Sequence, residues 1–122
     1  MKCRIILELL AILFFTGCYN REQISRLDEA EALIQNKPDS ALTILQQLKS
    51  EGSQAEQARY ALLYSEALDK NHIKATNDSL IRRAWEYYKH HPKDLRRQCK
   101  TLYYWGKVKL RAGDKPGALR LY

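Results

Sequence analysis

Residues 102–122 read LYYWGKVKLRAGDKPGALRLY, and this stretch decides the fold. Apolar and small residues recur in it at three- and four-residue steps, which is the spacing of one helix face. Gly113-Asp114 interrupts the pattern, and Lys115-Pro116 begins it again. Glycine commonly ends a helix, and proline fits the first turn of the next because its missing N–H costs nothing there. The stretch therefore predicts two helices joined by a tight turn.

Small residues occur on both predicted helices. Gly106 lies on the first helix and Ala118 on the second, with Tyr122 four residues further on. This pattern resembles the tetratricopeptide repeat (TPR), a helix-turn-helix unit of about 34 residues. The resemblance implies that Gly106 and Ala118 let the two helices come together and that Tyr122 fills an aromatic position beside them.

The same pattern occurs earlier in the chain. Ser65 takes the place of Gly106, 41 residues upstream, while Ala84 and Tyr88 match the small and aromatic positions of the second helix. A loop at 71–76 accounts for the long spacing, and a degenerate unit precedes these two. The expected fold is therefore all-α, with antiparallel helical hairpins stacked as a short TPR-like solenoid of about three hairpins, the last one incomplete.

Helical periodicity extends over most of the chain. It predicts helices over about 24–35, 38–51, 54–70, 77–89 and 93–112, and a further one from about 115. Ser53 followed by Glu56 matches a capping box at the start of the third helix. Because no stretch alternates with period two, no strand is predicted.

The N-terminal residues carry a targeting signal. An apolar run from Ile5 to Phe15 follows two positive charges and ends at Gly17-Cys18. The run is too short to span a bilayer and resembles the export signal of bacterial lipoproteins, although Glu8 places a charge inside it. The resemblance implies cleavage before Cys18, whose sulfur then carries the lipid that anchors the chain to a membrane. An ordinary cleaved secretory signal and a buried first helix are the alternatives.

The sequence thus divides into three parts. Residues 1–17 are the lipoprotein signal peptide, residues 18–23 a polar tether and residues 24–122 the TPR-like repeat domain. The second helix of the last hairpin reaches only to Tyr122, which predicts truncation of the domain at its C-terminus, since a solenoid needs a closing helix with a polar outer face. A chain that closes by dimerising is the alternative.

Two short phrases, Pro38–Leu42 and Asp78–Ile81, further resemble TPR lipoproteins of the Bacteroidetes type. That resemblance implies a place in the cell envelope, held by lipid. Tyr19, which follows the lipidated cysteine, is not the aspartate that retains lipoproteins in the inner membrane. We therefore expect the outer membrane of a Gram-negative bacterium.

Charge is unevenly spread along the chain. The total is +7, but residues 18–66 sum to −3 and residues 67–122 to +9. A basic half suits an anionic membrane surface, an acidic protein or a nucleic acid. The export signal argues against nucleic acid, and a solvated helical surface is the alternative that needs no partner.

The predicted helix over 93–112 carries the candidate binding residues. Its basic side chains recur at three- and four-residue steps and form a basic stripe: Lys93, Arg97, Lys100, Lys107 and Arg111, with Tyr104 inside it. By analogy with TPR proteins, the residues nearest the concave groove are Lys100, Tyr103, Lys107 and Arg111. Their cations suit carboxylates of an acidic peptide or a free C-terminus. A solvated outer face is again the alternative.

The opposite side of the same helix is expected to pack into the core. Its members are Leu95, Cys99, Leu102, Tyr103, Gly106 and Leu110. Cys99 is therefore expected to be a buried structural thiol. Among the aromatic residues, only Tyr87 and Tyr104 are expected to be exposed.

No arrangement of residues indicates catalysis. Adjacent His90 and His91 point to different sides of a helix, and neither has a cysteine or histidine partner at zinc-like spacing. No set of nucleophile, base and orienting group occurs, nor a glycine-rich phosphate loop. We expect no enzyme activity, no metal, no cofactor and no small-molecule substrate.

The sequence therefore predicts a non-catalytic protein–protein interaction scaffold, anchored in the cell envelope as a lipoprotein. Its partner is a protein or peptide, acidic in character, and the lipid anchor adds the membrane. The alternative is an exported sensor segment of a longer TPR-containing signalling protein. A third hypothesis, a cytosolic nucleic-acid binder, requires residues 1–17 to be retained.

Overall fold

The computed structural model describes residues 21–75 and 77–122, and its regular secondary structure in these ranges is helical, with no strand. A first helix covers residues 21–33. It is followed by α2 (Pro38–Gln47), α3 (Gln54–Lys70), α4 (Ser79–Tyr88), α5 (Leu95–Arg111) and α6 (Lys115–Leu121). The all-helical prediction is confirmed, and the predicted segments match these helices to within a few residues at most ends.

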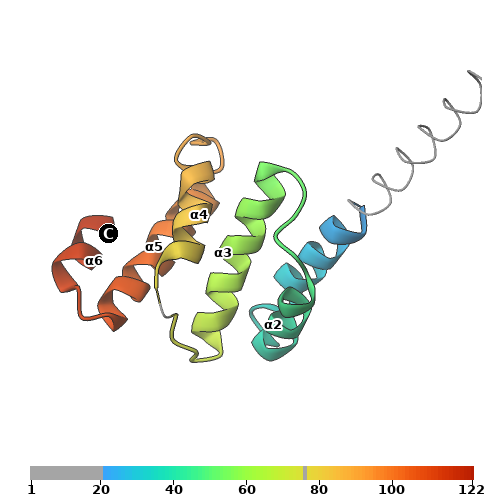
Figure 1. Ribbon diagram of the computed structural model, residues 1–122, viewed down its shortest axis with the longest axis horizontal. Coiled ribbons are helices and arrows are strands. Elements are labelled where there is room, and N and C mark those ends of the chain that lie inside the picture. The colour runs from blue at the N-terminus through green and yellow to red at the C-terminus, as the bar shows by residue number, and fades with distance from the viewer. Residues whose placement is uncertain (1–20, 76) are drawn as a thin grey trace, which may run out of the picture.

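The helices stand in a row in chain order. In Figure 1 the connections from α3 onward lie alternately at the lower and upper edges, so neighbouring helices run in opposite directions. Each helix from α2 to α6 packs against the next one, and α3 also packs against α5. The contact between α3 and α5 matters because it brings together charged residues that are far apart in sequence.

Local signals explain where the helices begin and end. The Ser53 side chain accepts a hydrogen bond from the Glu56 N–H at the start of α3, as the capping pattern predicts. Asp94 and Asp114 cap α5 and α6 in the same way. Gly113 ends α5 with φ of 82°, and the next N–H donates to the carbonyl of Lys109 at 2.9 Å, which is the glycine-terminated helix end.

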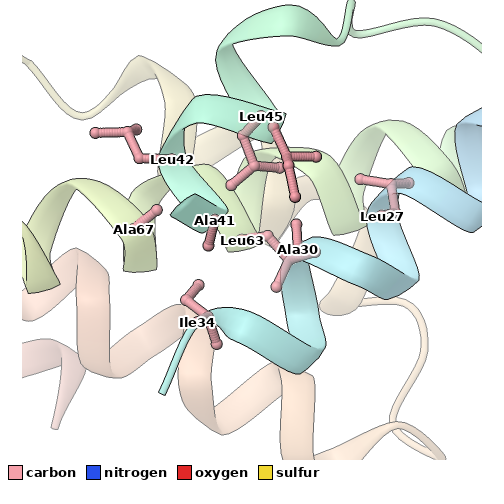
Figure 2. Close-up of a cluster of buried hydrophobic side chains, with 9 residues drawn as sticks. Leu27, Ala30, Ile34, Ala41, Leu42, Leu45, Leu63 and Ala67 are labelled. Atoms are coloured by element: carbon pink, nitrogen blue, oxygen red, sulfur yellow. The ribbon is translucent and has the colours of Figure 1, made fainter. Parts of the chain in front are cut away.

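The core forms two clusters that share α3. Figure 2 shows the first cluster, in which Leu27 and Ala30 of the first helix meet Leu45 of α2 and Leu63 and Ala67 of α3. The second cluster joins α3, α4 and α5: Ala58, Ala61, Leu62, Ile81, Ala84, Tyr88 and Tyr104. Because α3 contributes to both clusters, it is the central helix of the row.

Candidate functional site

The basic stripe lies on α5, and its cations are paired within the chain. Lys107 Nζ lies 2.9 Å from Oδ2 of Asp69, and Arg111 Nη2 lies 2.5 Å from Oδ1 of the same carboxylate. Lys100 Nζ lies 3.0 Å from Oε2 of Glu66. Both carboxylates belong to α3. These three cations therefore fasten α5 to α3 and are not a freely solvated row.

Glu66 is the most deeply placed charged residue of the described chain, with 0% of its surface exposed. Lys100 donates to both of its oxygens, and Gln35 Nε2 donates to Oε1 at 3.2 Å. Burial raises the pKa of the neighbouring Tyr104, and the charge of Glu66 raises it further. A buried carboxylate needs such partners, since an unpaired one would cost several kcal/mol.

A second group of ion pairs ties the first helix to the same assembly. Arg59 of α3 pairs with Asp28 at 2.6 Å and also with Glu31. Arg97 of α5 reaches Glu31 at 3.5 Å and Asp94 at 2.9 Å. Burial would raise the pKa of Glu31, but the hydrogen bond and charge of Arg59, with the charge of Arg97, bring it below its ordinary value. The two groups together join three helices through charge.

The sequence prediction of which side of α5 is buried was wrong for most of that side, although Gly106 is buried as expected. Tyr104, expected to be exposed, is only 7% exposed, while Tyr103, expected in the core, is 47% exposed. Cys99, expected to be a buried thiol, is also exposed. The reason lies in the neighbours: Trp105 Nε1 donates to Asp78 at 3.0 Å, and Tyr104 joins the second core cluster. These contacts rotate the other side of α5 toward solvent.

The side of α5 that faces solvent is apolar and continues onto α6. We call this surface the end stripe: Leu95, Cys99, Tyr103, Leu110, Leu119 and Tyr122. The five large members other than Cys99 are between 44% and 73% exposed. The Tyr103 and Tyr122 rings lie 6.4 Å apart, so the residue that follows α6 lies beside the exposed side of α5. The sequence indicated that the α5 part of this face is apolar. It could not indicate that this face stays exposed within the described chain.

The small residues of the last hairpin lie where α5 and α6 meet. Ala118 is buried, and Gly106 lies beneath the Tyr122 ring: a Cβ atom on Gly106 would stand 2.5 Å from two ring carbons. The aromatic ring thus occupies the space that a side chain at 106 would need. The exposed Tyr122 covers Gly106 and leaves its own outer surface in the end stripe.

The corresponding residues of the preceding hairpin are placed differently. Ala84 and Tyr88 of α4 are buried in the second core cluster, and burial raises the pKa of Tyr88 to about 12. Ser65 of α3 is only partly buried, and its hydroxyl donates to the Ala61 carbonyl of its own helix at 2.8 Å. Tyr88 is therefore enclosed where its counterpart Tyr122 is exposed.

The proposed lipidation site, Cys18, lies outside the described residues. Within the described ranges, no helix is long and apolar enough to cross a membrane. The lipid anchor is therefore an expectation that stands on the sequence pattern.

Within residues 21–75 and 77–122, no three histidine, cysteine or acidic side chains gather closely enough to hold a metal ion. His91 stacks on the Tyr87 ring with centroids 3.8 Å apart. The space between α3, α4 and α5, bordered by Ser65 and Asp69, has a free volume of about 20 Å³, which is enough for roughly one water molecule. It is too small for an organic ligand.

Comparison with known proteins identifies no relative: no family model, curated protein or solved structure matches the chain. A function for this chain therefore has to be argued from the arrangement of its residues. Two features distinguish it, the internally paired charges of α3 and α5 and the exposed end stripe.

Proposed function

We propose that this chain is a non-catalytic protein–protein interaction scaffold, built as a short TPR-like solenoid and held in the cell envelope by lipid on Cys18. The row of helices supports the solenoid part of the proposal. In stacked hairpins, the first helix of each unit lies beside the first helix of the next. The contact of α3 with both α4 and α5 agrees with that order.

The end stripe is the observation that carries the binding function. Scattered apolar residues on a protein surface need no explanation, but a large contiguous apolar patch marks a surface that contacts a protein, a membrane or a ligand. Here exposed apolar residues follow α5 from Leu95 to Leu110, and Leu119 of α6 and Tyr122, which follows α6, are exposed as well. Tyrosine is common where proteins bind, since its ring offers apolar area and its hydroxyl a hydrogen bond.

The paired charges define the role of the other candidate residues. Lys100, Lys107 and Arg111 are engaged with Glu66 and Asp69 and therefore position α5 against α3. Of the four residues proposed from the sequence to bind a partner, Tyr103 is the one most open to it. Lys107 Nζ lies 5.2 Å from the centre of the Tyr103 ring and orients it.

Photo-crosslinking in cells tests the binding function. A benzophenone amino acid placed at position 99 sits inside the end stripe, whereas the same group at position 43 sits on exposed α2 surface. We expect discrete protein adducts from position 99 alone, and their loss when Leu110→Glu is added. Equal adducts from both positions, or none from position 99, would contradict the proposal.

Metabolic labelling tests the anchor separately. We expect the wild-type chain to incorporate a palmitate analogue and to appear in outer-membrane fractions. Cys18→Ser should remove both properties while leaving the helical domain intact. An unlabelled wild-type chain with its N-terminal residues retained would refute the lipoprotein assignment.

A further inference from the structure

We infer that the edge of the helical row at which the first helix begins lies against the membrane, and that exposed cations of this edge contact the headgroups of anionic phospholipids. The inference rests on the proposed function, because it requires lipid on Cys18. Three observations support it: the short distance from Cys18 to the first helix, the elements gathered at that edge and the charge that they carry.

The anchor lies close to the folded part of the chain. The described helix begins at residue 21, three residues after Cys18. Three residues span at most about 11 Å, even when they are fully extended. Lipid on Cys18 therefore holds the start of the first helix near the bilayer surface. The edge of the row that contains this start is the edge that the anchor brings to the membrane.

Hydrogen bonds identify what else lies at this edge. Gln23 Nε2 donates to the carbonyls of Lys49 and Glu51 at 2.9 and 3.0 Å, which fixes the α2–α3 connection beside the start of the first helix. Arg83 of α4 donates to Ser50 Oγ of the same connection at 3.2 Å. In Figure 1 the first helix and α3 both begin toward the upper edge, where the α4–α5 connection also lies.

The α4–α5 connection gives this edge its charge. Residues 21–23 and 48–53 each hold one basic and one acidic residue, whereas residues 89–97 hold four basic residues and one acidic residue. That acidic residue, Asp94, already pairs with Arg97 at 2.9 Å. Three exposed cations of the edge form no ion pair within the described ranges: Lys49, Lys93 and Arg96. Basic residues held near an anionic bilayer are attracted to its surface.

The opposite edge of the row is also basic, so charge alone does not orient the protein. At that edge Asn71 Nδ2 donates to the Pro38 carbonyl at 2.9 Å and joins the end of α3 to the start of α2. Three exposed cations there form no ion pair within the described ranges either: Lys37, Lys74 and Lys115. The two edges are separated by the length of α5, whose 17 residues extend over about 25 Å. The anchor therefore decides which basic edge meets the lipid.

Fluorescence quenching by lipid tests the orientation. The lipidated chain carrying Cys99→Ser receives one new cysteine for a fluorophore, at an exposed residue of either edge. His90→Cys marks the inferred membrane edge and Ala112→Cys the opposite edge. Each chain is placed in lipid nanodiscs that contain a nickel-chelating lipid, which quenches only nearby fluorophores. In discs that contain phosphatidylglycerol we expect stronger quenching at position 90 than at position 112; equal or stronger quenching at position 112 overturns the inference.

The same measurement tests the contact with anionic headgroups. The difference between positions 90 and 112 should shrink in discs of neutral phosphatidylcholine and at high salt, which screens exposed charges. The triple change Lys49→Gln, Lys93→Gln and Arg96→Gln should lower the ratio of membrane-facing to other orientations by at least about tenfold.

A matched variant controls for net charge. The triple change Lys37→Gln, Lys74→Gln and Lys115→Gln removes the same charge from the opposite edge, and quenching at position 90 should stay unchanged. Circular dichroism checks that both variants keep their helices. Equal effects of the two triple changes, or a wild-type difference that is the same in neutral and anionic discs, overturn the contact between these cations and lipid.

The possible results separate the inference from the function on which it rests. A wild-type chain that incorporates no palmitate analogue overturns both the anchor and the inference. A lipidated chain that is quenched equally at positions 90 and 112 overturns the inference alone and leaves the anchored scaffold standing.

Discussion

The Nζ atom of Lys100 lies 3.0 Å from Oε2 of Glu66, and this pair joins α5 to α3 across 34 residues of sequence. The carboxylate is fully buried, whereas the lysine keeps 27% of its side chain exposed. The buried Glu66 carboxylate therefore needs Lys100 as a partner more than the partly exposed Lys100 needs Glu66. A residue that the sequence indicated as a binding group thus also maintains the packing of two helices.

Lys100→Ala should destabilise the fold. Removing one partner of a fully buried ion pair costs about 3–5 kcal/mol, while an exposed pair contributes at most about 1 kcal/mol. Because this pair is buried on one side only, we expect a loss of about 2–3 kcal/mol in the free energy of unfolding, measured with urea. Lys93→Ala, at an exposed lysine in no ion pair of the described chain, serves as the control. Equal stability of the two variants would contradict the structural role of Lys100.

Asp78 should contribute stability that depends on pH. Burial raises the pKa of its carboxyl, but the hydrogen bond from Trp105 and the contacts with Arg82 bring it below the ordinary value of 3.8. Since the folded pKa lies below the unfolded one, this stabilisation is fully present above about pH 4. It is lost as the pH falls through the folded pKa. Asp78→Asn keeps an acceptor for Trp105 but removes the charge.

The measurement is the difference in unfolding free energy between the wild type and Asp78→Asn. We expect it to be largest near pH 6 and to shrink below pH 4. The exposed Asp39, which lies in no ion pair of the described residues, supplies Asp39→Asn as the matched substitution to be measured beside it. A wild-type advantage over Asp78→Asn that is constant from pH 6 to pH 2 would contradict the assignment.

The helices could be predicted from sequence because their signals are local. Apolar spacing within one helix, the Ser53 cap and the Gly113 stop each involve residues a few positions apart. Which side of α5 packs against the core could not be predicted. Tyr103 and Tyr104 are adjacent, and each has apolar neighbours one turn away, so the pattern fits either side.

The partners that decide the orientation of α5 are distant in sequence. Tyr104 packs into a cluster with α3 and α4, and Trp105 donates to Asp78, 27 residues away. The ion pairs of the basic stripe also depend on residues that are distant in sequence. Glu66 and Asp69 lie on α3, and nothing in the sequence marks them as the partners of cations on α5. Cations could therefore be found from sequence, but whether they are free could not.

His72→Gly should stabilise the protein. His72 is the one described residue other than glycine with a positive φ, 59°, and it ends α3 where the Ile73 N–H donates to the Leu68 carbonyl at 2.9 Å. A side chain in this left-handed conformation costs about 1–2 kcal/mol. Glycine avoids this cost, but it loses more backbone entropy on folding, which offsets part of the gain. We expect a net gain of about 0.5–1 kcal/mol by thermal and urea unfolding. His90→Gly, at an exposed residue without positive φ, should give no gain; equal effects at both positions would refute this explanation.

The packing of Tyr122 on Gly106 can be tested by coupling two substitutions. Glycine inside a helix costs about 1 kcal/mol relative to alanine, so Gly106→Ala would stabilise α5 if space allowed. The three atoms nearest to the added Cβ all belong to Tyr122, the closest at 2.5 Å, so the ring has to move. We therefore expect Gly106→Ala to be neutral or destabilising in the wild type but to stabilise a Tyr122→Ala chain by about 1 kcal/mol. The double-mutant cycle, measured by urea unfolding, should show a coupling of at least about 1 kcal/mol. Additive effects would mean that Gly106 and Tyr122 do not share this space, and the proposed close approach of α5 and α6 at that point would then be wrong.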